Sequence, residues 1–105
     1  MKKAVNLQFT DNERDRIEKI CQKKSIGMAT FLRMLFLKNK DAWIEKNQQG
    51  IYINYEIPGE TKNLIQTWID QEDYDILKSI SVRSNVQMAR IFRQIIVPGL
   101  TEERI

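Results

Sequence analysis

The 105-residue chain contains no histidine and a single cysteine, Cys21. One cysteine cannot form a disulfide within the chain, and without histidine there is no plausible set of zinc ligands. The commonest general acid–base is also missing, so the Cys21 thiol lacks a histidine to activate it. No serine lies in a nucleophile elbow, and no glycine-rich loop follows an expected strand. We therefore expect no enzymatic activity, metal or cofactor, and we expect Cys21 to be a small buried hydrophobic residue.

Long apolar runs are missing too. The longest, residues 31–37, is interrupted by Arg33 and is far shorter than the roughly 20 residues that cross a bilayer. The N-terminal residues do not form the apolar stretch of a signal peptide, so we expect a cytoplasmic protein without membrane contact. With 42% hydrophobic and 30% charged residues, the composition is that of a globular protein.

The net charge of +3 is unevenly distributed along the chain. Residues 1–47 contain 11 Lys and Arg against 6 Asp and Glu, a balance of +5. Residues 48–105 contain 6 against 8, a balance of −2, and the two balances add up to +3. A basic first half favours a polyanionic partner.

The sequence also repeats itself. A shift of 60 residues lays segment 5–10 (VNLQFT) over 65–70 (IQTWID) and segment 26–33 (IGMATFLR) over 86–93 (VQMARIFR), without a gap. Repetition in one phase indicates two copies of one structural unit. The identical residues in the later segments are Met28 and Met88, Ala29 and Ala89, and Arg33 and Arg93.

Each unit begins with a pattern typical of a half-buried strand. In residues 3–9, apolar side chains alternate with small or polar ones, which predicts two different faces. Thr10 and Glu13 then fit a capping box, so a helix begins there; Asp70 caps the equivalent helix, with Asp73 favouring its positive end. The inward strand residues are Val5, Leu7 and Phe9, and the outward ones are Ala4, Asn6 and Gln8.

After a turn, at residues 23–25 and again at 83–85, the pattern predicts a second helix in each unit. These helices start near Gly27 and Gln87, and the second one ends at Pro98-Gly99. Arg33 and Arg93 lie well inside them, so we expect these residues to form salt bridges. The apolar faces are Met28, Phe31, Leu32, Leu35 and Phe36 in the first copy and Met88, Ile91, Phe92, Ile95 and Ile96 in the second.

One strand and two short helices cannot bury this much apolar surface, and a lone strand leaves its backbone groups unpaired. We therefore predict a mainly α fold with short β-structure, in which the two units form a two-stranded antiparallel ribbon and a four-helix core. The predicted parts are a first unit at 1–47, a linker at 48–62, a second unit at 63–97 and a C-terminal tail at 98–105.

Two segments leave alternatives open. Residues 38–48 can prolong the second helix, with Ala42, Trp43 and Ile44 packing back, and residues 51–57 alternate as an extra strand would. A winged helix with 51–57 in a hairpin is the alternative fold. Residues 61–81 could also form one long helix, because Leu64, Ile65, Trp68 and Ile69 are spaced as a helix face.

The succession of strand, capped helix, turn and apolar helix resembles the ribbon-helix-helix (MetJ/Arc/CopG) superfamily. The resemblance covers residues 2–37 well and 63–97 less closely, and the tandem arrangement is similar to the TraY-like proteins of conjugative plasmids. It implies a ribbon that lies in the DNA major groove. It further implies that outward strand residues read base edges, namely Ala4, Asn6 and Gln8 with Leu64, Gln66 and Trp68.

In this superfamily the start of each second helix holds phosphates through backbone N–H groups. By resemblance those sites are Gly27, Met28, Gln87 and Met88, and nearby cations could add charge. These cations are Lys2, Lys3, Lys23, Lys24 and Arg83.

The expected function is site-specific binding of double-stranded DNA, in a transcriptional regulator or in an accessory protein of the relaxosome at a plasmid transfer origin. Self-association through residues 51–57 and contacts with other DNA-processing proteins are further expectations. The competing class is a protein-interaction module with an exposed aromatic surface, formed by Trp43, Tyr52, Tyr55 and Trp68.

Overall fold

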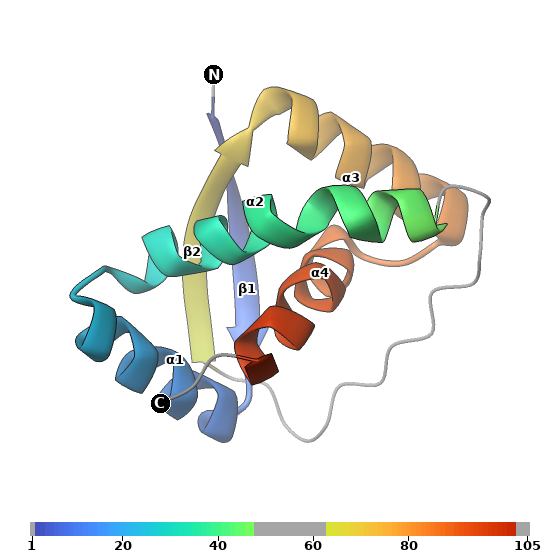
Figure 1. The fold of residues 1–105 in the computed structure, drawn as a ribbon. Helices are drawn as coiled ribbons and strands as arrows, with labels where there is room; N and C mark the ends of the chain where they lie inside the picture. Colours follow the sequence, from blue (N-terminus) through green and yellow to red (C-terminus); the bar gives the residue numbers. More distant parts are fainter. Residues whose placement is uncertain (1, 48–62, 103–105) are drawn as a thin grey trace.

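The computed structural model describes residues 2–47 and 63–102, which form two strands and four helices (Figure 1). The described part is mainly α-helical with a two-stranded antiparallel sheet, as the sequence predicts. The expected strand at 51–57 lies outside the described residues. In chain order the elements are β1 (Lys2–Phe9), α1 (Asp11–Lys24), α2 (Met28–Asn47), β2 (Asn63–Asp70), α3 (Gln71–Ser84) and α4 (Met88–Glu102).

The two strands confirm the predicted alternation. β1 buries Val5, Leu7 and Phe9 and exposes the residues between them. β2 is a strand rather than the start of a long helix, since its burial also alternates and it pairs with β1 along its whole length. Its inward Thr67 is fully buried, and its hydroxyl donates to the Ala29 carbonyl at 2.7 Å, which removes the cost of burying a polar group.

The same order of elements occurs twice, with α1 and α3 beginning at residues 11 and 71 and α2 and α4 at 28 and 88. The predicted capping box is present: the Thr10 hydroxyl accepts from the Glu13 N–H, and the Glu13 carboxylate accepts from the Thr10 N–H. Asp70 holds the equivalent position, but its side chain makes no capping hydrogen bond. Its carboxylate lies 3.6 Å from the Arg33 guanidinium instead.

The hydrophobic core lies on one side of the ribbon. α2 crosses the two strands, and α1 and α3 lie toward opposite ends of the sheet (Figure 1). Phe36 of α2 stacks on Phe92 of α4 with ring centroids 4.6 Å apart, so residues of both units share one core. Cys21 is buried, as expected, and burial raises the pKa of its thiol.

The predicted end of the last helix at Pro98-Gly99 is wrong, because α4 continues to Glu102. Proline lacks the N–H that an internal helical residue donates, but the turn beyond it is held by tertiary contacts. Leu100 is buried in the core, and its carbonyl accepts a 2.9 Å hydrogen bond from Arg16 of α1. Gly99 allows a close approach to α2, since an added Cβ would lie 2.9 Å from Asn39 Nδ2.

The extension of α2 is confirmed as far as Asn47, the last described residue before the gap. Trp43 and Ile44 pack against the core as expected. Ala42 was expected to pack in the same way, but it is exposed.

Leu100 provides a test of the extended helix. We expect Leu100→Ala to lower the free energy of unfolding by about 2–5 kcal/mol, the range for a leucine side chain removed from a packed core. Urea denaturation would measure it. Leu37→Ala is the matched control, because Leu37 is 42% exposed, and it should cost about 0.5 kcal/mol. Equal losses in the two variants would show that the last turn of α4 does not contribute to the core.

Candidate nucleic-acid interface

The outward face of the ribbon gathers all the residues expected to read bases. Ala4, Asn6 and Gln8 of β1 are exposed on it, as are three residues of β2, namely Leu64, Gln66 and Trp68. The strand register places these residues in three cross-strand pairs. They are Ala4 with Trp68, Asn6 with Gln66, and Gln8 with Leu64.

The middle pair is joined by a hydrogen bond. Gln66 Nε2 donates to Asn6 Oδ1 at 3.0 Å. This bond occupies one donor of Gln66 and one acceptor of Asn6, and it holds the two side chains in a fixed relation. The Asn6 amino group and the Gln66 carbonyl oxygen make no other hydrogen bond to the described residues, so both are available to a ligand on the exposed face.

A depression of about 310 Å³ joins this face to the start of α4. Asn6, Gln8 and Leu64 line it from the ribbon, and Gln87 and Arg90 line it from the helix, with Ala89 and Arg93. The structure therefore brings two expected base-reading residues next to Gln87, one of the expected phosphate sites. It also adds Arg90, an exposed cation in the first turn of α4.

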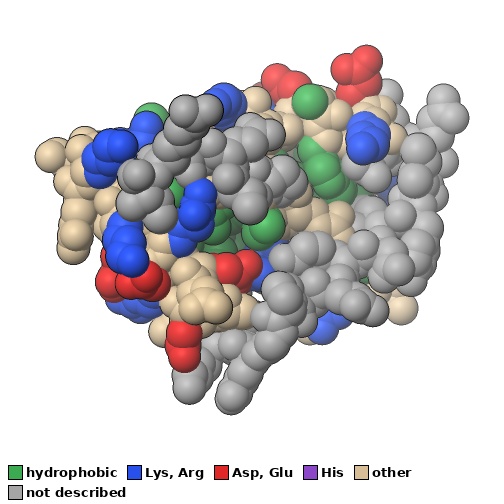
Figure 2. Space-filling view, turned by 60° about the horizontal axis from the view of Figure 1, so that its bottom comes forward, with side chains coloured by type: hydrophobic (Ala, Val, Ile, Leu, Met, Phe, Trp, Pro, Cys, Tyr) green, Lys and Arg blue, Asp and Glu red, His purple; other side chains and the backbone are tan. Residues whose placement is uncertain are grey.

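The start of α2 lies against the other strand, since the Ala29 carbonyl accepts from Thr67 of β2. An added Cβ at Gly27 would meet no atom within 4 Å, so this helix start is open to a ligand. Lys23 and Lys24 lie in the last turn of α1 rather than in the predicted turn, which begins only at Ser25, and both are exposed. Figure 2 shows Lys and Arg side chains gathered on the side where α1 leads into α2, with Asp and Glu side chains beside them.

The remaining expected phosphate residues differ in their placement. Lys2 is exposed on the outward face and pairs in register with Asp70. Lys3 belongs to the inward alternation, and its Nζ lies 5.9 Å from the centroid of the Tyr74 ring on α3, so it is turned away from the residues expected to read bases. Arg83 is exposed in the last turn of α3, and Met28 and Met88 are half-buried against the core.

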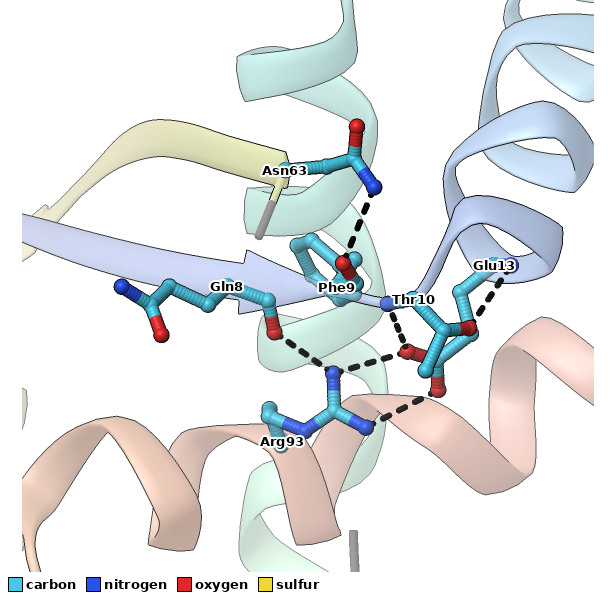
Figure 3. Close-up of polar contacts among 6 residues, drawn as sticks. All are labelled: Gln8, Phe9, Thr10, Glu13, Asn63 and Arg93. Carbon is cyan, nitrogen blue, oxygen red and sulfur yellow. Dashed lines mark hydrogen bonds and ion pairs between the residues drawn. The ribbon is translucent and has the colours of Figure 1, made fainter. Parts of the chain in front are cut away.

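The end of β1 is held by a buried ion pair (Figure 3). The Arg93 guanidinium, whose side chain is 2% exposed, makes two hydrogen bonds to the Glu13 carboxylate at 2.9 and 3.0 Å. One of its nitrogens also donates to the Gln8 carbonyl at 2.8 Å. This side chain of the second unit thus fixes both the strand residue Gln8 and the capping box of the first unit.

The environment of Glu13 has opposing effects on its acidity. Burial alone would raise the pKa of this carboxyl. Hydrogen bonds from Arg93 and Thr10, together with the charge of Arg93, outweigh burial and hold the pKa below its ordinary value. Glu13 is therefore a carboxylate at neutral pH and provides the partner charge that a buried guanidinium requires.

The equivalent contacts at the other end of the ribbon are arranged differently. The expected salt bridge of Arg33 is present, but its partner is Asp70. Asp73, the repeat equivalent of Glu13, is buried and pairs with Lys40 of α2 at 2.6 Å. The two ends of the ribbon are therefore held by cross-unit ion pairs that do not match residue for residue.

Arg90 is the residue of this surface that the sequence analysis missed. The signal was present in the repeat, because Arg90 stands where the first unit has Thr30. α4 therefore has a cation in its first turn where α2 has an uncharged threonine, so the two units differ at this position. Such a difference is more informative than the matched positions, which mostly pack into the core.

Comparisons with protein-family models, curated proteins and solved structures found no match to this chain. The described helices include none that is long and apolar enough to cross a membrane. Within residues 2–47 and 63–102, no group of three or more Cys, Asp or Glu side chains is arranged to hold a metal ion.

The ion pair at the end of β1 gives a second prediction. Glu13→Gln should lower the free energy of unfolding at pH 7 by about 3 kcal/mol, because Arg93 stays buried without its charge partner. A lowered carboxyl pKa contributes stability that is complete above the ordinary pKa and is lost as the pH falls through the lowered value. The variant should therefore lose less stability than the wild-type protein across that acidic range.

Chemical denaturation at a series of pH values would measure both effects. Glu18→Gln is the matched control, since Glu18 pairs with Arg14 within α1 and both side chains are partly exposed. We expect it to cost about 0.5 kcal/mol or less. Parallel pH profiles for the wild-type protein and Glu13→Gln would contradict the assignment.

Proposed function

We propose that this chain is a cytoplasmic, site-specific binder of double-stranded DNA, built as a tandem ribbon-helix-helix protein. The observation that carries the proposal is the outward face of the ribbon, where Asn6, Gln8 and Gln66 are exposed side by side and none of the four described helices covers them. A two-stranded ribbon with a free face has the width that the major groove admits.

The chemistry of the face suits base edges. Asparagine and glutamine can bond adenine through N6 and N7, and apolar side chains can contact the thymine methyl group. The outward Ala4, Leu64 and Trp68 provide such apolar contacts around the amides. Leu64 and Trp68 are 58% and 44% exposed, so both side chains are accessible to a ligand on this face.

Phosphates would be bound on both sides of the ribbon. The starts of α2 and α4 lie against β2 and β1, respectively, so their N-terminal N–H groups flank the reading face. Lys2, Lys23 and Arg90 add exposed positive charge around it. Contacts of this kind position a protein on the duplex without reading its sequence.

The two units together form one reading module in this proposal. β1 and β2 are repeat equivalents, and each is needed to pair the other. Because their outward residues differ, one chain should recognise an asymmetric site. The resemblance to TraY-like proteins favours an accessory role at a plasmid transfer origin, and transcriptional regulation is the alternative role for the same binding activity.

Leu64 and Trp68 also support a second candidate function. Two large apolar side chains exposed on one strand are a common feature of protein interfaces. In that case the ribbon face would bind a protein, and the amides of Asn6 and Gln8 would lie at the rim. The DNA-binding experiments below separate the two functions.

The third prediction concerns base reading. The double variant Asn6→Ala/Gln8→Ala should lose about 30-fold or more in affinity for a selected site and little for an unrelated duplex, because each of the two lost base contacts provides about 1–3 kcal/mol of discrimination. Mobility shifts on the two duplexes would measure the ratio. Lys78→Ala, an exposed change in the middle of α3, should leave it unchanged.

If the double variant kept the sequence preference of the wild-type protein, the outward face of the ribbon would not be the surface that reads the bases. If the wild-type protein bound no duplex, and Trp68→Ala abolished capture of a protein partner, the protein-interaction function would be favoured instead.

The fourth prediction concerns Arg90. Arg90→Thr installs the residue that the first unit has at position 30, and it should weaken binding to all duplexes alike. The slope of log affinity against log salt should become shallower by about 1, the value for one lost phosphate contact. Lys78→Thr is the matched loss of a cation outside the depression, and an equal change in its slope would contradict a specific contact by Arg90.

A further inference from the structure

The centre of the ribbon is occupied by two different amides. Asn6 faces Gln66 in the antiparallel register, and the 60-residue shift makes them repeat equivalents as well. Since register partners add up to 72, this is the only position of the described ribbon where a residue pairs with its own equivalent. The middle of any bound site would therefore lie under this pair, with Ala4–Trp68 on one side and Gln8–Leu64 on the other.

The hydrogen bond within the pair has a direction. Gln66 donates and Asn6 accepts, at 3.0 Å. Asn6 is left with both hydrogens of its amino group, which donate, and Gln66 is left with both lone pairs of its carbonyl oxygen, which accept, beside its second N–H. In a pair of identical residues either direction would be equivalent, but here the unequal side-chain lengths make the two directions different arrangements.

We propose that the Asn6–Gln66 pair reads the centre of the DNA site as one directional unit. Asn6 donates to an acceptor in the major groove, which is guanine O6, a purine N7 or thymine O4. Gln66 accepts from a base amino group, adenine N6 or cytosine N4. This inference rests on the proposed DNA-binding function and adds to it the class of bases at the centre and a single orientation of the chain on its site.

The pairs on either side of Asn6–Gln66 also differ from each other, which favours a single orientation of the chain on its DNA site. On one side Trp68 lies opposite the small Ala4, and on the other Gln8 lies opposite Leu64. The second side also carries Arg90, in the depression that Gln8 and Leu64 line, whereas Thr30 is the equivalent residue of the first unit. Turning the chain around would exchange an aromatic end for a polar, basic one.

The test is selection of binding sites from a duplex pool with randomised sequence, followed by affinity measurements. Asn6→Asp is the decisive variant, because an aspartate oxygen can still accept from Gln66 while the amino group is replaced by a second oxygen. In the wild-type protein, Asn6 should select a base that presents an acceptor atom at the centre of the site. In Asn6→Asp we expect this position to select a base amino group instead, adenine N6 or cytosine N4. Its affinity for the wild-type site, relative to an unrelated duplex, should fall roughly 10- to 100-fold.

Gln8→Glu is the matched control, since it makes the same amide-to-acid change one outward position along β1. It should alter the preference at a flanking base pair and leave the centre unchanged. Thermal unfolding of both variants would show that the ribbon is intact, and the unrelated duplex corrects for the added negative charge.

The outcomes separate this inference from the function on which it rests. If the wild-type protein enriches no sequence, the proposed function fails and this inference fails with it. If it enriches a defined site whose centre is twofold symmetric, or if Asn6→Asp keeps the wild-type central preference, the directional pair is overturned while DNA binding stands.

Discussion

The antiparallel pairing of β1 with β2 is the interaction on which the rest of the structure depends. Each strand alone would expose a row of unpaired backbone groups and half of an apolar face. Pairing satisfies the ladder between the strands and joins Val5, Leu7 and Phe9 to Ile65 and Ile69 in one inward surface. Helices of both units cover that surface, the outward residues of the two strands stay exposed among the described elements, and the starts of α2 and α4 lie beside them.

Most of this arrangement could be predicted because its signals are local. A strand buried on one face must alternate, and the capping box of Thr10 and Glu13 closes within four residues. The turns before the second helices are local as well: Ser25 and Asn85, at equivalent positions, both take left-handed backbone angles with φ near 56° and 57°. The 60-residue repeat favoured a strand at β2, where the apolar spacing of residues 64–69 alone also fitted a helix.

The features that could not be predicted depend on contacts between distant residues. Proline and glycine near residue 98 are helix-ending signals in isolation, but Gly99 packs against Asn39, and Leu100 is held by Arg16. Asp73 was placed correctly in the first turn of its helix, yet nothing local indicated that Lys40, 33 residues away, would pair with it. Arg90 joins the ribbon face only because α4 of one unit packs beside β1 of the other.

Inward positions keep their residue class between the two units, whereas outward positions do not. The covalent linkage of the two units allows this difference. Inward positions must fill a shared core, so Val5 and Phe9 keep apolar equivalents in Ile65 and Ile69, and the polar exception, Thr67, is satisfied by the Ala29 carbonyl. Outward positions carry no such packing constraint. They differ at every pair, and two identical chains could not produce that difference, because symmetry would place the same residue on both strands. A chain with two linked units can therefore keep a nearly symmetric fold and still present an asymmetric outward face.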